Sequence, residues 1–224
     1  EKALEYHKKS LKIYEEIGDK KGIGNSYNNI GTIYRSQGNY EKALEYHKKS
    51  LKIKKEIGNK KGMRSSYNNI GNIYFDQGNN EKALEYHKNS LKINEEIGDK
   101  RGMSSSYNNI GIIYSEQGNN EKALEYYEKS LKINEEIGDK RGMSNSYSNI
   151  GFIYSEQGNN EKALEYHKNS LKIFEKIGDK KRMGISYHYI GAIYDEQGKY
   201  EKALEYLLKS KNIMEETNVI TYLD

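Results

Sequence analysis

The chain contains no cysteine and no proline among its 224 residues. Without cysteine there can be no disulfide, no thiol nucleophile and no thiolate metal ligand, and such a composition fits a reducing compartment. No run of about 18 apolar residues is present, and no signal peptide is recognisable, so we expect no membrane-spanning helix and a cytoplasmic location.

The chain also has a small net charge and few apolar residues. The formal net charge is +4, which is too small to suggest a protein that binds nucleic acid. Hydrophobic residues make up only 34% of the chain and the mean hydropathy is −1.05, values that in a compact globule would indicate disorder. The apolar residues recur periodically, however, and 22 tyrosines supply part of the missing apolar mass, with hydroxyls that can reach the edge of a thin core. We therefore predict an ordered chain.

The sequence repeats itself with a constant period. Aligning the chain on itself brings five isoleucines into one column, each followed by a glycine: Ile30, Ile70, Ile110, Ile150 and Ile190. A fixed period of this length is typical of a solenoid, in which each unit contacts mainly its neighbours. Any specificity must then lie in the residues that differ between copies.

Each repeat predicts two helices. The first spans residues 20–37 in the first copy, with Asp19 as its N-cap and Gly38 as its left-handed stop. The second spans residues 41–57, is capped by Asn39 and ends at Gly58. Its predicted inner face consists of Ala43, Leu44, His47, Ser50, Leu51 and Ile57.

These repeats divide the whole chain. Residues 1–17 form a second helix without a first helix before it, and residues 218–224 form a capping tail. Between them we expect five helix pairs: 18–57, 58–97, 98–137, 138–177 and 178–217. The predicted fold is all-α, an α-solenoid of about eleven helices in stacked antiparallel pairs that forms a single array over residues 1–224.

The stretch from Tyr67 to Ile93, YNNIGNIYFDQGNNEKALEYHKNSLKI, resembles the tetratricopeptide repeat (TPR). The residues that match its pattern are Tyr67, Ile70, Gly71, Tyr74, Gly78, Ala83 and Leu91. Ser90 replaces a small alanine, His87 replaces an aromatic residue, and the usual terminal proline is missing. The longer repeat is similar to that of kinesin light chains, G-protein-signalling modulators and bacterial regulators. The resemblance implies a right-handed superhelix and a protein-interaction scaffold that binds peptides in a concave groove lined by the first helices.

One face of the first helix lies opposite its buried stripe and should line this groove. An asparagine recurs there in four repeats: Asn29, Asn69, Asn109 and Asn149. Because a carboxamide both donates and accepts hydrogen bonds, this column can pair with the backbone of an extended peptide whatever its side chains. Long-repeat relatives use matching asparagines in this way. The alternative is that the column hydrogen-bonds between helices or simply faces solvent.

Other residues on and beside this face vary between repeats. The candidate ligand contacts are Asn72, Phe75, Ile112, Glu116, Phe152 and Glu156. The two phenylalanines fall outside the buried stripe and are candidate apolar anchors, while acidic residues accumulate toward the last repeats. They predict a ligand with one or two apolar side chains and with basic residues toward the C-terminal repeats, unless the variation is only drift.

Neither catalysis nor a bound cofactor is expected. His7, His47, His87 and His167 recur in one column, but they alternate with Tyr127 and Leu207 in a packing position. Direct ligation needs a nitrogen within about 2.1 Å of the metal, and successive repeats lie too far apart for that, so we expect no metal site. No nucleophile stands beside a base, and no glycine-rich loop cradles a phosphate, so we expect no enzyme.

The leading functional hypothesis is therefore a scaffold that binds a protein or peptide partner. The alternative is a structural module that self-assembles end to end. The unpaired helix of residues 1–17 in one copy could stack on the exposed face of the last helix pair in another copy. Helical-repeat RNA binding is the least favoured, because it calls for basic, stacking residues in a groove that here turns acidic.

Overall fold

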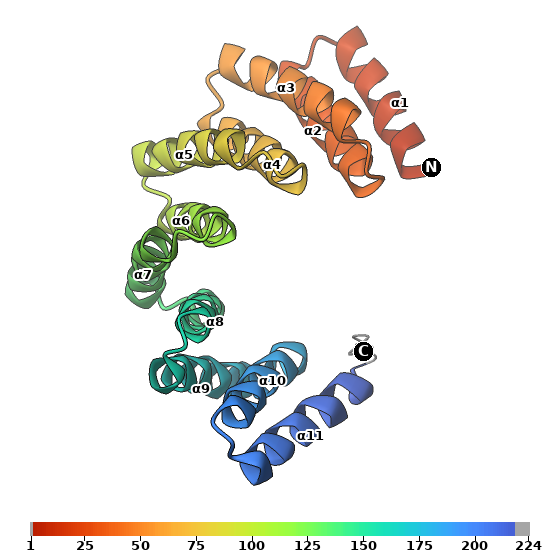
Figure 1. Ribbon diagram of the computed structural model, residues 1–224. Helices are drawn as coiled ribbons and strands as arrows, with labels where there is room; N and C mark the ends of the chain where they lie inside the picture. Colours follow the sequence, from red (N-terminus) through yellow and green to blue (C-terminus); the bar gives the residue numbers. More distant parts are fainter. Residues whose placement is uncertain (1, 218–224) are drawn as a thin grey trace. The chain divides into compact units, whose positions relative to one another are not determined.

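The computed structural model describes residues 2–217 (Figure 1). Within this range the regular structure consists of eleven α-helices and no strand. The predicted tail 218–224 lies outside the described residues. The contacts divide the chain into two compact units, Glu1–Gln117 and Gly118–Asp224.

The first unit contains helices α1 to α6 and the second contains α7 to α11. The helices of the first unit are α1 Lys2–Glu16, α2 Lys20–Ser36, α3 Tyr40–Glu56, α4 Lys60–Asp76, α5 Asn80–Ile97 and α6 Lys100–Glu116. Those of the second are α7 Asn120–Ile137, α8 Lys140–Glu156, α9 Asn160–Ile177, α10 Lys180–Glu196 and α11 Tyr200–Glu216.

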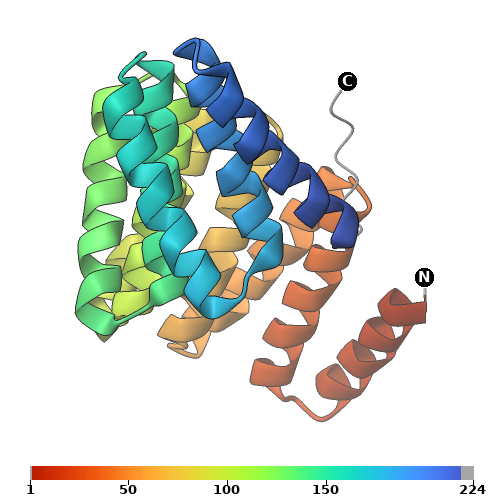
Figure 2. The same ribbon diagram turned by 90° about the horizontal axis from the view of Figure 1, so that it is seen from below.

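Successive helices form hairpins. In the first unit α2 packs along α3 and α4 along α5 (Figure 1). In the second unit α8 packs along α9, and α10 along α11, which Figure 2 shows in blue. The contact inside each pair is more extensive than that from α3 to α4 or from α9 to α10. This arrangement confirms the predicted α-solenoid of stacked helix pairs.

The predicted caps are confirmed at the helix ends. The Asp19 carboxylate accepts a hydrogen bond from the Gly22 N–H at 3.0 Å, and the Asn39 side chain accepts one from the Lys42 N–H at 3.2 Å. Gly38 adopts a positive φ of 72°, which glycine adopts without the strain that a Cβ would cause. These short-range contacts are why the helix boundaries could be predicted closely.

The expectation that Ile57 faces inward is wrong. Helix α3 ends at Glu56, so Ile57 occupies the C-cap and its side chain is 38% exposed. The other predicted inner-face residues of α3 are buried or half-buried. In the first repeat, Ile30, Tyr34 and Ala43 form a core cluster together with Ile73 of the next first helix.

Tyrosines extend this core to its edge. The rings of Tyr34 and Tyr46 stack with their centroids 5.5 Å apart, and the same pair recurs as Tyr154 and Tyr166 in the second unit. The hydroxyl of Tyr27 reaches back to donate a hydrogen bond to the Glu15 carboxylate at 3.2 Å. A tyrosine therefore supplies apolar area to the thin core and a polar contact at its rim.

The glycine column permits the closest approach between paired helices. A Cβ added to Gly71 would lie 2.9 Å from the imidazole of His87 on the facing helix. Replacing glycine by alanine inside a helix ordinarily stabilises it by about 1 kcal/mol. Here the added methyl group would displace a buried ring, so we expect Gly71→Ala to lower the free energy of unfolding by about 1–3 kcal/mol. Urea unfolding followed by circular dichroism measures this change.

A matched control is Gly24→Ala in the same unit. The added Cβ there would meet its nearest atom, Ile53 Cγ2, at an ordinary contact distance of 3.4 Å. We expect Gly24→Ala to be neutral or stabilising. If Gly71→Ala proved as stable as Gly24→Ala, the close approach of Gly71 to His87 would not be what requires glycine at this position.

Candidate functional site

In each unit the first helices carry the residues that the sequence singled out. In the first unit Asn29 is exposed on α2, and Asn69 and Asn109 are half-buried on α4 and α6. Asn69 Nδ2 donates a hydrogen bond to Asn28 Oδ1 on the neighbouring α2 at 3.0 Å. Part of the Asn69 amide is therefore engaged between repeats, as the alternative interpretation of this column anticipated, while its remaining hydrogen-bonding capacity is not used by that contact.

An ion pair joins the C-terminal ends of α2 and α4. Arg35 donates to both Asp76 carboxylate oxygens, through Nε at 2.7 Å and through an Nη at 3.2 Å. Arg64 similarly pairs with Asp99, at 2.6 Å. Neither pairing could be predicted from the sequence, because the partners are 41 and 35 residues apart. Pairing neutralises them, so the first unit offers a ligand less charge than its sequence suggests.

The remaining candidate residues of the first unit differ in how much of each side chain is exposed to a ligand. Phe75 is half-buried and packs against the core cluster that contains Leu51 and Ile70, so only part of its ring can meet a ligand. Asn72 and Ile112 are half-buried as well, and Glu116 is exposed at the end of α6.

In the second unit, aromatic residues gather on the first helices. Phe152 on α8 is 38% exposed, and its ring meets Tyr189 of α10 edge-on, with the centroids 6.4 Å apart. Tyr189 in turn stacks on His167 of α9, at 4.9 Å and an interplanar angle of 8°. Asn149 is half-buried and Glu156 is exposed. Phe152 and Tyr189, which are distant in sequence, thus form one aromatic surface.

The histidine column lies inside the helix pairs. His47, His87 and His167 are at most 1% exposed. Burial lowers the pKa of each ring to about 4, and the positive charges of Lys54 and Arg35 contribute further to the shift at His47. His87 Nδ1 lies 3.3 Å from Asn68 Oδ1, whereas neither ring nitrogen of His47 or His167 has a partner among residues 2–217. These histidines pack as neutral rings.

A buried layer of polar side chains was not predicted from the sequence. Ser50 Oγ donates to the Gly24 carbonyl at 2.7 Å and lies 3.2 Å from Ser66 Oγ. The ammonium group of Lys54 donates to the same Ser66 hydroxyl at 3.2 Å, although the Lys54 residue is only 3% exposed. Burial lowers the pKa of Lys54 to about 8. The only signal in the sequence was the position of Lys54 one helical turn after Ser50.

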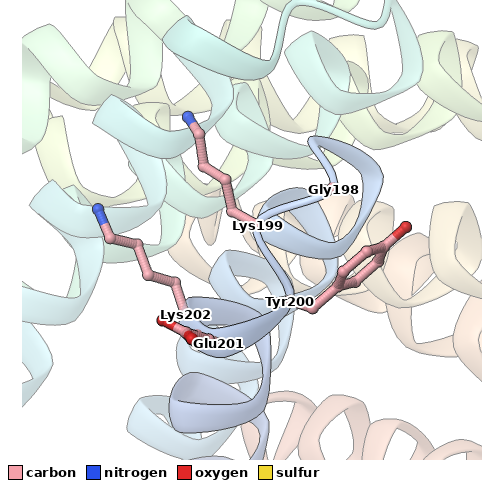
Figure 3. A pocket seen from close by; sticks show the side chains of 5 residues that line it. All are labelled: Gly198, Lys199, Tyr200, Glu201 and Lys202. Atoms are coloured by element: carbon pink, nitrogen blue, oxygen red, sulfur yellow. The ribbon is translucent and has the colours of Figure 1, made fainter.

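A hollow of about 450 Å³ lies at the turn between α10 and α11 (Figure 3). Its lining consists of Gly198, Lys199, Tyr200, Glu201 and Lys202. Lys199 stands where the other second helices have a capping asparagine, and it makes no side-chain cap. All five lining residues are exposed, and the ammonium of Lys199 donates to the Gln197 side chain at 2.7 Å. We assign no ligand to this hollow.

The described part of the chain holds no group of three histidine, aspartate or glutamate side chains placed to bind a metal ion. Between residues 2 and 217 no helix is both long and apolar enough to cross a membrane. The first-helix residues that vary between repeats include amides, aromatic and aliphatic side chains, hydroxyls and carboxylates.

Helix pairs that stack on their neighbours and present one face of each first helix define a helical repeat protein of the α-solenoid class. The chain belongs to the tetratricopeptide repeat family, whose model matches residues 1–56, 62–136 and 142–216. A search of the curated proteins found no match.

Solved structures of other repeat proteins are similar to this chain. BtubC (BKLC) from P. vanneervenii is 18% identical with a TM-score of 0.86, and the match covers 100% of this chain and 94% of that one. The STAND protein PH0952 from Pyrococcus horikoshii, described as having a tetratricopeptide repeat sensor, is 26% identical with a TM-score of 0.82. That match covers 98% of this chain but only 35% of PH0952. Aspartyl phosphate phosphatase F from Bacillus subtilis is 17% identical with a TM-score of 0.78, over 93% of this chain and 64% of its own.

Proposed function

We propose that the chain is a non-catalytic scaffold that binds an extended peptide or partner segment along the exposed faces of its first helices. The observation that carries the proposal is that the repeats differ on the outer face of their first helices. The isoleucine column of the core is identical and fully buried in Ile30, Ile70 and Ile110. Thr32, Asn72 and Ile112 occupy one position of the outer face in the first unit, and no two are alike.

The family and one relative support this proposal. Members of the tetratricopeptide repeat family commonly serve as protein-interaction scaffolds, and the matched segment of PH0952 belongs to a protein whose repeats are described as a sensor. A recognition role for this chain is consistent with both. The asparagine column would hold the ligand backbone, and the variable residues would select its side chains.

Peptide selection tests the asparagine column. We expect a displayed library of random peptides to enrich on the wild-type chain, and the enriched peptides to bind Asn69→Ala/Asn109→Ala roughly tenfold more weakly, because each lost hydrogen bond contributes about 0.5–1.5 kcal/mol. Fluorescence anisotropy with a labelled enriched peptide gives the two Kd values.

The control is Asn28→Ala. This change removes the hydrogen bond between α2 and α4 but leaves the Asn69 amide in place. It should retain peptide binding, and unfolding of all variants reports any loss of stability. Equal binding by Asn69→Ala/Asn109→Ala and wild type would make the column structural. If no peptide enriched, self-association through the apolar residues exposed on α1 or α11, such as Tyr6 or Leu204, would become the better account.

A further inference from the structure

The second unit carries an exposed surface, here called the α8–α10 face, that combines an apolar part with an acidic part. The apolar part is Phe152, Ile185 and Tyr189, and the acidic part is Glu156, Asp195 and Glu196. Phe152 and Ile185 are each 38% exposed, although both are large apolar side chains. In the first unit the positions that match Phe152 carry Thr32, Asn72 and Ile112, and those that match Ile185 carry Asn25, Ser65 and Ser105.

Ring contacts position the two aromatic residues of the apolar part, Phe152 and Tyr189. The Tyr189 ring stacks on His167, which is fully buried on α9, and the Phe152 ring contacts Tyr189 edge-on. Packing on a buried residue restricts the orientation of the Tyr189 ring, and the edge-on contact with Tyr189 restricts the Phe152 ring. Binding to such a surface therefore costs little side-chain ordering.

In the acidic part, Glu196 lacks the cation that neutralises its counterpart Asp76 in the first unit. There, Asp76 on α4 is paired with Arg35 on α2. The matching residues of α10 and α8 are Glu196 and Ser155, so the arginine has been replaced by a neutral hydroxyl. Within the described residues, no lysine or arginine pairs with the carboxylates of Glu156, Asp195 or Glu196.

The spacing of the two parts sets the kind of ligand. Glu156 follows Phe152 by one helical turn, which corresponds to about 6 Å along the axis. An extended peptide advances by about 3.3 Å per residue, so side chains two residues apart span this distance. Side chains three residues apart span the roughly 10 Å from Tyr189 to Glu196, which are seven residues apart on α10. The unpaired carboxylates attract cations and the exposed rings attract apolar groups. Charge and spacing therefore both favour a peptide segment that carries an apolar and a basic side chain close together.

We propose that the α8–α10 face binds a peptide segment of a partner protein that carries a large apolar side chain with lysine or arginine two or three residues away. This assignment rests on the proposed peptide-binding function and names its ligand class. The apolar side chain packs on Phe152 and Tyr189, and the basic side chain pairs with Glu156 or Glu196.

The test uses the peptides enriched from a random library on the full chain, together with synthetic copies in which the basic or the apolar residue is replaced by alanine. We expect enriched sequences to combine a large apolar residue with a nearby lysine or arginine. Phe152→Ala should weaken binding at least about tenfold, as for a central apolar contact. Glu156→Gln/Glu196→Gln should weaken it about fivefold at low salt, and the difference should shrink at high salt.

The matched control is Glu161→Gln/Glu201→Gln, which makes the same change of charge at exposed positions on second helices of the same unit. It should bind like wild type. If peptides enrich and Asn69→Ala/Asn109→Ala weakens them, but Phe152→Ala and Glu156→Gln/Glu196→Gln do not, the scaffold function stands and this assignment is overturned. If no peptide enriches, both are overturned.

Discussion

Acidification from about pH 7 to pH 4 is expected to destabilise the fold strongly through its buried histidines. Burial lowers the pKa of His47 and His167 to about 4, whereas an unfolded histidine titrates near 6.5. Between these values the unfolded chain binds more protons than the folded chain, so stability falls as the pH falls through this window. Each ring contributes about 3 kcal/mol to this loss, and two such rings approach the whole stability of a typical domain.

The chain itself supplies the substitution that isolates this effect. Leu207 occupies the histidine position on α11 and packs against Gly191, as His47 does against Gly31. We expect His47→Leu/His167→Leu to resemble or exceed the wild type in stability at pH 8, because neither histidine ring has a hydrogen-bond partner to lose. At pH 4.5 the variant should be the more stable by several kcal/mol, about 2–3 for each ring replaced.

Urea unfolding at several pH values measures both stabilities, and NMR titration of the histidine ring protons reports the pKa values directly. Carboxylates also contribute to acid unfolding, but they are the same in both proteins and cancel in the difference. A difference between variant and wild type that did not grow from pH 8 to pH 4.5 would contradict the role assigned to these rings.

Replacing Lys54 by methionine is expected to stabilise the protein by about 2 kcal/mol at pH 7. Burial lowers the pKa of Lys54 to about 8, so its ammonium is still charged at pH 7 while the residue is only 3% exposed. A pKa lowered from about 10.5 corresponds to a penalty of about 3 kcal/mol, from which the lost hydrogen bond to Ser66 subtracts about 1 kcal/mol. Methionine has a similar length, and Met214 occupies the matching position on α11.

The pH dependence distinguishes this account from simple repacking. Above pH 8 the folded chain releases the Lys54 proton, whereas the unfolded chain keeps it up to about pH 10.5. The wild type should therefore gain stability between pH 8 and pH 10, and the advantage of Lys54→Met should shrink over that range. Unfolding in urea at pH 7 and pH 9.5 gives both differences. An advantage that was constant with pH would point to packing alone.

Much of the fold could be predicted from the sequence because the deciding contacts are short in range. Asp19 and Asn39 cap helices that begin at the next residue, and Gly38 reverses the chain within one turn. Repetition then made each assignment apply in every copy. The main error was at Ile57, which is exposed at the C-cap of α3 although helical periodicity places it on the inner face.

The candidate site was predicted less completely because its properties depend on pairs of distant residues. Arg35 and Asp76 are 41 residues apart in the sequence, and only the packing of α2 beside α4 brings their side chains to 2.7 Å. Phe75 looked available in the helical pattern, yet it packs against a core cluster. Tyr189 stands at the asparagine position of the last repeat, and only the structure shows that it joins Phe152 to the buried His167.

The sequence by itself determined the repeat, the helix ends, the buried isoleucine column and the family to which the chain belongs. All of these follow from residues within one or two helical turns, or from the period. Tertiary structure alone decided which charges are neutralised, that Lys54 is enclosed, and which rings gather into the α8–α10 face. The physical reason is that charge pairing and desolvation depend on distances between atoms of different repeats, and packing sets those distances.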